Sequence, residues 1–173
     1  MPYYTGIGSR ITPNEILNVM SQLGNIFKET YILRSGGASG ADLAFEKYLN
    51  EQEADIFLPW KNFNNHKSNL FHIKNEAYDI ASRHHKYWQY LKPATKKLMA
   101  RNVHQVLGIM LDKPSEFLIC WTPDGASSSE EITKDTGGTG LAISVASEFN
   151  VPVYNLKNKD VLDSISKQYN III

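Results

Sequence analysis

Short apolar segments of β-type composition alternate along this chain with longer segments of helical periodicity, and this alternation limits the fold more than any other feature. The strand-like segments cover residues 3–4, 31–33, 56–58, 117–121 and 151–156. The helical patterns cover residues 13–28, 40–49 and 141–149, and a longer region at about 70–107 that is interrupted near Pro93. Strands that alternate with helices predict an α/β domain with three layers around a mainly parallel sheet.

The whole chain is expected to form one domain, over residues 1–173. No linker rich in proline, serine or glycine divides the sequence, and no internal repeat is visible. A short final helix is expected over residues 160–166, and the apolar residues 171–173 are expected to add a closing strand. The length suits a single hydrophobic core.

The composition of the chain argues against several classes of function. The 18 Lys and Arg residues balance 18 Asp and Glu residues, so the formal charge is zero, which lowers the expectation of a long polyanionic partner. Cys120 is the only cysteine, which excludes an intrachain disulfide and a cysteine-based zinc site. No apolar stretch reaches membrane-spanning length and the N-terminus lacks a signal pattern, so we expect a soluble, cytoplasmic protein without a membrane partner.

Three glycine-rich segments lie beside the predicted strands and helices. Residues 5–10 follow the first strand, residues 35–40 follow the second, and residues 136–140 precede the helix that starts near Leu141. In a parallel sheet such loops share the edge at which ligands bind, and glycine lets a backbone approach an anion closely. None of the loops ends in the Gly-Lys-Ser/Thr of an ATPase P-loop. We therefore expect a crevice that binds a phosphate-bearing ligand.

Residues 6–10, 34–46, 58–60 and 137–140, in this order, resemble the SLOG superfamily of Rossmann-like proteins. The resemblance is nearest to the DprA-like and YpsA-related branches and covers most of the chain outside residues 62–115. It implies a Rossmann-like three-layer domain with a helical insertion at about 62–111. It also implies a nucleotide or nucleotide-derived ligand at the carboxyl edge of the sheet, and a homodimer or higher homo-oligomer.

The first functional hypothesis is a binding protein that senses, carries or sequesters a nucleotide-derived phosphate ligand, such as a cyclic nucleotide or an ADP-ribose-like molecule, without a cofactor. An alternative is a LOG-type phosphoribohydrolase, which cleaves the N-glycosidic bond of a nucleotide. LOG enzymes carry a proline, a threonine and a catalytic glutamate where this chain has Thr136, Leu141 and Ile143. Asp42 or Glu46 would then have to supply the carboxylate that this chemistry needs.

Each candidate residue also has a structural explanation. Asp42 and Glu46 lie one turn apart on a predicted helix, where an acid can interact with the helix dipole or pair with a neighbouring base. Arg10 can clamp a phosphate or remain a surface charge. Trp60 can stack on a base or pack at the domain edge, and Asp124 can bind a hydroxyl or form a turn. The residues expected to bind the ligand are Gly6, Gly8, Ser9, Arg10, Ser35, Gly36, Gly37, Ala38, Ser39, Gly40, Trp60, Lys61, Arg101, Asn102, Trp121, Asp124, Gly137, Gly138, Thr139 and Gly140.

Residues 80–111 contain no acidic residue but six basic ones, interleaved with Tyr87, Trp88 and Tyr90. One interpretation is an amphipathic helical insertion, and another is a surface for single-stranded DNA of the kind that the DprA resemblance allows. A third places Arg101 and Asn102 over the nucleotide as a lid. Adjacent histidines at 84 and 85 point in different directions on a helix and have no acidic neighbour, so no metal site is expected.

Overall fold

A computed structural model describes residues 1–173, and its centre is a sheet of five strands. The strands are β1 (Tyr3–Gly6), β2 (Ile32–Ser35), β3 (Ala54–Ile56), β4 (Leu118–Cys120) and β5 (Val153–Asn155). Their order is β3-β2-β1-β4-β5, and every neighbouring pair is parallel. This is a Rossmann-like topology, so the predicted fold class is confirmed.

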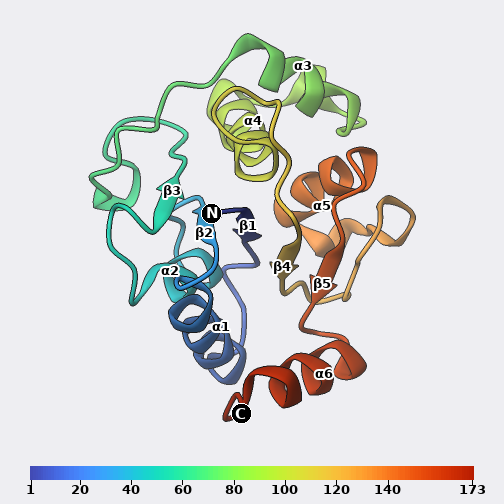
Figure 1. Ribbon diagram of the computed structural model, residues 1–173. Helices are drawn as coiled ribbons and strands as arrows, with labels where there is room; N and C mark the ends of the chain where they lie inside the picture. The colour runs from blue at the N-terminus through green and yellow to red at the C-terminus, as the bar shows by residue number, and fades with distance from the viewer.

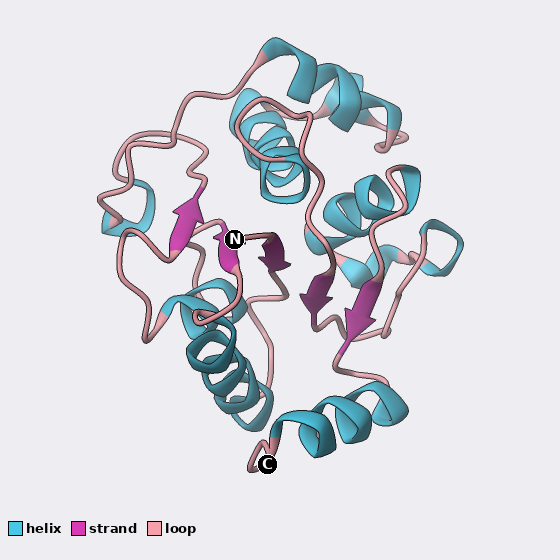
Figure 2. Cartoon of the chain, in the orientation of Figure 1, coloured by secondary structure: helices cyan, strands magenta, loops and turns pink.

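Helices cover both faces of the sheet (Figures 1 and 2). They are α1 (Asn14–Phe27), α2 (Ala41–Glu46), α3 (Asn75–Arg83), α4 (Pro93–Leu107), α5 (Thr139–Glu148) and α6 (Lys159–Tyr169). Helices α1, α2 and α6 lie on one face, and α3, α4 and α5 lie on the other (Figure 1). None of these helices is both long enough and apolar enough to cross a membrane.

Two apolar clusters fill the spaces between the layers. The first joins the sheet to α1, α2 and α6 and contains an edge-to-face pair between Tyr4 and Phe27, whose ring centroids are 5.2 Å apart. The second joins the sheet to α4 and α5, and includes the fully buried Val103 and Ile143. Buried aliphatic side chains of this size each stabilise a fold by about 1.5–3 kcal/mol, so a strand must have apolar residues on both faces. This requirement explains the wholly apolar sequence of the central strand β4, Leu-Ile-Cys.

The prediction of a closing strand at residues 171–173 is wrong. Asn170 adopts a left-handed conformation with φ 53°, which ends α6. The Ile171 N–H then donates to the Ser166 carbonyl at 2.9 Å, and the Ile172 N–H donates to the Gln22 side chain of α1 at 3.1 Å. The apolar C-terminus therefore packs on α1 and does not extend the sheet.

The topology defines where a ligand can bind. The chain order reverses at β1, which lies between β2 and β4, and in such sheets a crevice forms beyond the carboxyl ends of the strands at that point. The loops after β1 and β2 both reach this edge. Helix α4 lies in the long connection between β3 and β4, so the insertion supplies one of the helices that cover the sheet.

Candidate ligand-binding crevice

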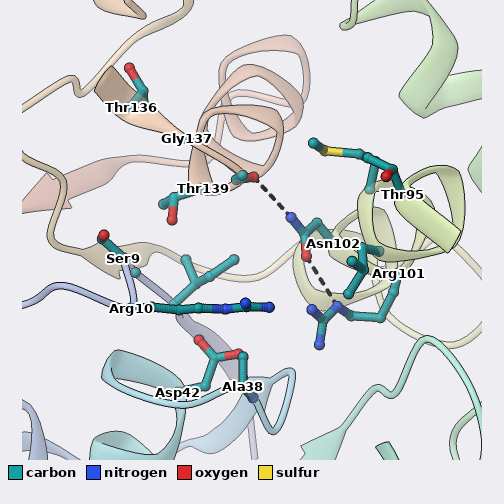
Figure 3. A pocket seen from close by; sticks show the side chains of 15 residues that line it. Ser9, Arg10, Ala38, Asp42, Thr95, Arg101, Asn102, Thr136, Gly137 and Thr139 are labelled. Atoms are coloured by element: carbon teal, nitrogen blue, oxygen red, sulfur yellow. Dashed lines mark hydrogen bonds between the residues drawn. The ribbon is translucent and has the colours of Figure 1, made fainter. Parts of the chain in front are cut away.

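A crevice of about 310 Å³ lies at this edge of the sheet, a volume within the range of small-molecule sites (Figure 3). It is formed by the loops after β1 and β2, the first half of α4, and the loop that leads into α5. Segments more than 90 residues apart in the sequence therefore share one cavity. Its lining residues are Ile7, Gly8, Ser9, Arg10, Ala38, Asp42, Thr95, Leu98, Met99, Arg101, Asn102, Thr136, Gly137, Gly138 and Thr139.

The structure brings part of the predicted site together. Ten of the predicted residues line the crevice: Gly8, Ser9, Arg10, Ala38, Asp42, Arg101, Asn102, Gly137, Gly138 and Thr139. The other predicted residues lie outside its lining: Gly6, Ser35, Gly36, Gly37, Ser39, Gly40, Glu46, Trp60, Lys61, Trp121, Asp124 and Gly140. All three glycine loops contribute to the crevice, but they do so in different ways.

The glycines of the first two loops allow close packing within the protein. A Cβ atom on Gly8 would lie 2.7 Å from the Cβ of Ala41 and 3.1 Å from the carbonyl oxygen of Trp121. A Cβ atom on Gly36 would collide with the Arg101 guanidinium and lie 2.8 Å from the Asp42 carboxylate. A side chain fits at neither position, so close packing is enough to explain why glycine occurs there, without any ligand.

The third loop is different, because its glycines face open space. Nothing lies within 4 Å of a Cβ built on Gly137 or Gly138. The backbone of Gly138 is in the ordinary helical region, with φ −62° and ψ −25°, so its conformation does not require glycine either. The N–H groups of Gly137 and Gly138 donate no hydrogen bond within the chain. Free N–H groups at the start of α5 are suited to an anion.

Two arginines add positive charge to the crevice. Arg10 lies on the surface at the end of the first loop and forms no ion pair. Arg101 extends from α4, is buried, and donates from Nη1 to the Gly36 carbonyl and, at 3.2 Å, to the Phe57 carbonyl. Burial lowers the pKa of Arg101, and the neighbouring charge of Arg10 lowers it further, whereas Asp42 raises it. The Arg10 side chain extends toward the Arg101 guanidinium, and Asp42 is the only carboxylate in the lining (Figure 3).

Asn102 connects α4 to the third loop. Its Oδ1 accepts a hydrogen bond from Arg101 Nε at 3.1 Å, and its Nδ2 donates to the Gly138 carbonyl at 3.0 Å (Figure 3). Both ends of the Asn102 amide are thus used within the protein. Asn102 holds the third loop in place and has less capacity left for a ligand than the sequence predicts.

Asp124 also holds the third loop, from outside the crevice. Its carboxylate accepts hydrogen bonds from Thr122 at 2.8 Å, from Thr133 at 2.7 Å, and from the Thr136 hydroxyl. Partial burial opposes its ionisation, but the bonds from Thr136, Thr133 and Thr122 prevail, and the pKa of Asp124 lies well below its usual value. These contacts favour the structural explanation of Asp124 over direct binding to a ligand.

Asp42 is the only acidic side chain in the crevice lining. It is buried in the first turn of α2, and its Oδ2 accepts a hydrogen bond from the Ala38 N–H at 3.3 Å. Burial raises the pKa of Asp42 to about 6, although the Arg101 charge and the N–H group of Ala38 act in the opposite direction. A carboxyl group with such a pKa can accept a hydrogen bond from a sugar hydroxyl or act as a general base near neutral pH.

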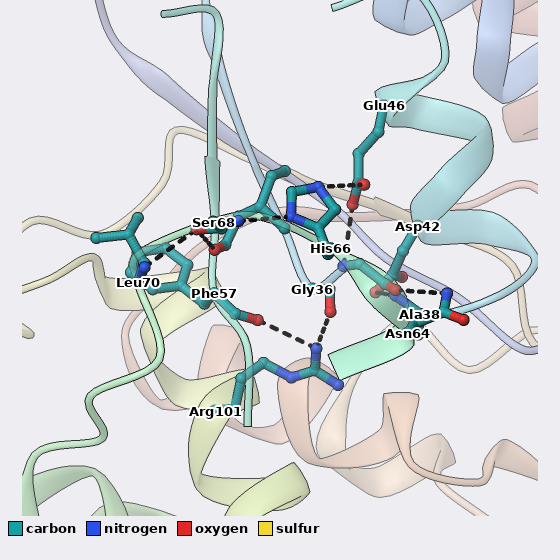
Figure 4. Close-up of polar contacts among 12 residues, drawn as sticks. Gly36, Ala38, Asp42, Glu46, Phe57, Asn64, His66, Ser68, Leu70 and Arg101 are labelled. Carbon is teal, nitrogen blue, oxygen red and sulfur yellow. Dashed lines mark hydrogen bonds and ion pairs between the residues drawn. The ribbon is translucent and has the colours of Figure 1, made fainter. Parts of the chain in front are cut away.

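Glu46 lies one turn further along α2 and outside the crevice lining, and its carboxylate points toward His66 (Figure 4). Its Oε1 accepts a hydrogen bond from the Gly37 N–H at 3.0 Å, and its Oε2 lies 3.6 Å from Nε2 of His66. Burial and the neighbouring Asp42 carboxylate raise the pKa of Glu46 to about 8. Glu46 holds the second glycine loop from outside the crevice, whereas Asp42 lines the crevice.

Replacing Glu46 with glutamine should flatten the dependence of stability on pH. Because the pKa of Glu46 is raised from 4.5 to about 8, the folded protein retains a proton that the unfolded chain releases. The free energy of unfolding therefore falls as the pH rises from about 4.5 to 8. Urea denaturation should show equal stability of the variant and native protein at pH 4, and a variant more stable by up to roughly 5 kcal/mol at pH 9. Parallel pH profiles would contradict this assignment.

The aromatic and lysine residues after β3 do not reach the crevice. Trp60 is partly exposed and packs edge-to-face on Phe63, with ring centroids 5.3 Å apart. The Phe63 ring in turn lies 5.6 Å from the Arg101 guanidinium. Lys61 is exposed on the same surface segment. Packing at the domain edge, the alternative given for Trp60, agrees with these contacts.

Five lining residues were missed by the sequence analysis: Ile7, Thr95, Leu98, Met99 and Thr136. Three of them lie on α4 at helical spacing from Asn102, so the 3.6-residue period would have predicted them once Asn102 was placed. Ile7 and Thr136 directly adjoin predicted glycines. Ile7, Leu98 and Met99 are the large apolar residues of the lining, which we call the apolar wall, whereas the other lining side chains include three charged groups, one amide and four hydroxyls.

The topology and the crevice define a Rossmann-like α/β protein with a crevice at the point where the strand order reverses. No group of three or more His, Cys, Asp or Glu side chains is placed to hold a metal ion. No match was found among protein-family models, curated proteins or solved structures.

Proposed function

We propose that this protein belongs to the SLOG superfamily and binds a nucleotide-derived phosphate ligand, such as a cyclic nucleotide or an ADP-ribose-like molecule. One observation carries the proposal. The guanidinium groups of Arg10 and Arg101 lie at the same crevice as the backbone N–H groups of Gly137 and Gly138, which donate no hydrogen bond within the protein. Arginine pairs and helix N-termini are the groups with which proteins bind phosphate.

The chemical groups of the lining suggest how the proposed ligand would lie in the crevice. A phosphate fits the start of α5, where Gly137 and Gly138 leave room and the helix dipole favours negative charge. A sugar hydroxyl would donate to the Asp42 carboxylate. The base would then lie against the apolar wall that includes Leu98 and Met99. Of the three glycine loops, only the third would then contact the phosphate.

Replacing Arg10 with glutamine should weaken ligand binding by about tenfold or more, because a hydrogen bond to a charged group contributes about 1.5–3 kcal/mol. Calorimetric titration with AMP, cyclic AMP and ADP-ribose measures the affinity. Arg10 is exposed and unpaired, so its loss should leave the melting temperature unchanged. Lys167→Gln, on the exposed side of α6, removes the same charge at a distance and serves as the control.

The native protein should produce heat with at least one of these nucleotides. Mass spectrometry of the supernatant after denaturation provides a second measurement, because a retained ligand would be released. If none of the titrations gives heat and no nucleotide is released, the proposed function is wrong.

A second function, hydrolysis of the N-glycosidic bond, is favoured by the position of Asp42. Its carboxyl group lines the crevice, with its pKa raised to about 6 by burial. Glu46, the other candidate, is separated from the crevice and bound to the Gly37 N–H. Chromatography of the nucleotide mixtures after incubation would reveal free base if the reaction occurs. An Asp42→Asn variant that releases base at the native rate would exclude this mechanism.

A further inference from the structure

A second cavity, with a volume of about 470 Å³, lies at the C-terminal end of α4. One wall is formed by residues 69–76, which lead into α3, and another by the turn after α4 at residues 108–111. Phe57 and His104 complete the lining. The volume is within the range of small-molecule sites, and none of the lining residues belongs to the crevice. The proposed function therefore leaves this cavity unused.

His104 joins the two walls. It is 3% exposed, its Nε2 accepts a hydrogen bond from the Lys74 N–H at 3.2 Å, and its Nδ1 donates to the Gly108 carbonyl at 3.0 Å. Burial lowers the pKa of His104, and the hydrogen bond to the Gly108 carbonyl opposes this effect. The charges of Lys74 and His72 lower the pKa further, so the ring is neutral near pH 7, as these two hydrogen bonds require. Phe57 stacks on the same ring, with centroids 5.6 Å apart, so buried side chains fix the shape of the cavity.

The turn after α4 places two apolar side chains in the lining. Gly108 and Leu111 both have a positive φ, of 83° and 63°, which is unfavourable for a leucine. Leu111 packs against the second apolar cluster, whereas Ile109 and Met110 remain 49% and 60% exposed. A ligand in the cavity would remove apolar surface of both side chains from water, which favours binding.

Lys74 supplies an uncompensated positive charge beside these apolar residues. Its Nζ lies 4.0 Å from Sδ of Met110 and forms no ion pair. A thioether is only a weak acceptor, so the ammonium group keeps its capacity to bind an anion. Glu76 also lines the cavity, and its carboxylate would repel a group with two negative charges more strongly than a group with one. The polar part of the cavity therefore suits a single negative charge.

We propose that this cavity is a second ligand-binding site, which takes a carboxylate with an apolar body, such as a medium-chain fatty acid or an arylalkanoic acid. The carboxylate would pair with the Lys74 ammonium group, and the body would lie against Ile109 and Met110. A phosphate monoester suits the site less well, because its second charge would face Glu76. The inference does not depend on the proposed function, since the two cavities share no residue.

A series of small ligands tests the charge and the apolar body separately. Calorimetric titration compares butanoate, hexanoate and octanoate with 1-octanol and octylamine, which have an alkyl chain but no negative charge. Each added methylene group should tighten carboxylate binding by up to about fourfold. Octanoate should bind about tenfold more tightly than 1-octanol, because only the carboxylate can pair with the ammonium group. A comparison of octanoate with 4-phenylbutanoate distinguishes an aliphatic body from an aromatic one.

Two variants assign these effects to the cavity. Lys74→Met keeps the backbone N–H that bonds to His104, and should lower octanoate affinity about tenfold while changing 1-octanol affinity by less than about twofold. Ile109→Ser/Met110→Ser should weaken the binding of both ligands, by about tenfold or more. Both apolar side chains are exposed, so the melting temperature should change little. The control Lys167→Met removes a lysine of α6 that lies outside the cavity.

Methionine methyl groups report which cavity is occupied. Of the four methionines of the chain, Met110 lines the second cavity and Met99 lines the crevice. In NMR spectra of protein with ¹³C-labelled methionine methyl groups, octanoate should shift the Met110 resonance and leave that of Met99 in place. A nucleotide bound as proposed above should have the reverse effect. The variants Met110→Leu and Met99→Leu assign the two resonances.

The outcomes separate this inference from the proposed function. The inference is wrong if no carboxylate binds, if octanoate binds no more tightly than 1-octanol or octylamine, or if Lys74→Met leaves octanoate affinity unchanged. It is also wrong if octanoate shifts Met99 instead of Met110. If octanoate shifts Met110 while AMP, cyclic AMP and ADP-ribose all fail to shift Met99, the inference stands and the proposed function is wrong.

Discussion

Replacing Gly138 with leucine should weaken nucleotide binding by about 100-fold or more, a loss of about 2.7 kcal/mol. The Gly138 backbone has φ −62° and ψ −25°, which any L-residue adopts, and no atom of the protein lies within 4 Å of its missing Cβ. The new side chain would therefore meet only the ligand and cover the N–H groups at the start of α5. The melting temperature should change by less than about 2 °C.

A matched glycine shows the opposite behaviour. Gly36→Ala places a Cβ 2.7 Å from Cζ of Arg101 and 2.8 Å from the Asp42 carboxylate, so we expect this smaller change to lower stability markedly. Differential scanning fluorimetry and calorimetric titration measure the two effects separately. If Gly138→Leu binds nucleotide as the native protein does, the phosphate does not lie at the start of α5.

Replacing Arg101 with methionine should destabilise the protein by about 3–5 kcal/mol, because it removes the donor to two carbonyl groups and leaves the buried Asp42 carboxyl group without a nearby positive charge. Arg101 is 5% exposed, and its guanidinium joins the Gly36 carbonyl to the Phe57 carbonyl (Figure 4). Its charge also lowers the pKa of Asp42 against the effect of burial. Urea denaturation at pH 7 measures the loss.

A double-mutant cycle shows how much of this loss comes from Asp42. Adding Asp42→Asn to Arg101→Met removes the uncompensated carboxylate, so the double variant should be more stable than Arg101→Met alone. The destabilisation by Arg101→Met should also shrink as the pH falls below 6, because Asp42 then becomes neutral. If the two substitutions have additive costs and the loss is the same at pH 5 and pH 7, the pair makes no such contribution.

Local patterns were sufficient to predict the order of the main elements. The apolar runs at 117–121 and 151–156 contain β4 and β5, and the helical period at 13–28 contains α1 almost to the residue. The chain end was predicted wrongly because three isoleucines suit a strand and a packed terminus equally well. The packed terminus is favoured by burial of Ile171 in the first apolar cluster and by the hydrogen bond between Gln22 and Ile172.

The candidate site was predictable in outline, because loops at the same edge of a parallel sheet must lie close together. Helical spacing alone could not separate Asp42 from Glu46, since residues one turn apart share a face of α2. In the folded protein, Asp42 lines the crevice, whereas Glu46 contacts His66, so the two carboxyl groups have different surroundings.

The sequence by itself determined an α/β chain with three glycine loops at one edge of its sheet, because hydrophobic periodicity and turn chemistry are local properties. Only the tertiary structure decided what each glycine does. Gly36 is confined by Arg101, which lies 65 residues away, whereas Gly138 faces open space. Steric fit and free hydrogen-bonding capacity depend on neighbours brought together by folding, so a glycine required by packing and one available to a ligand look the same in the sequence.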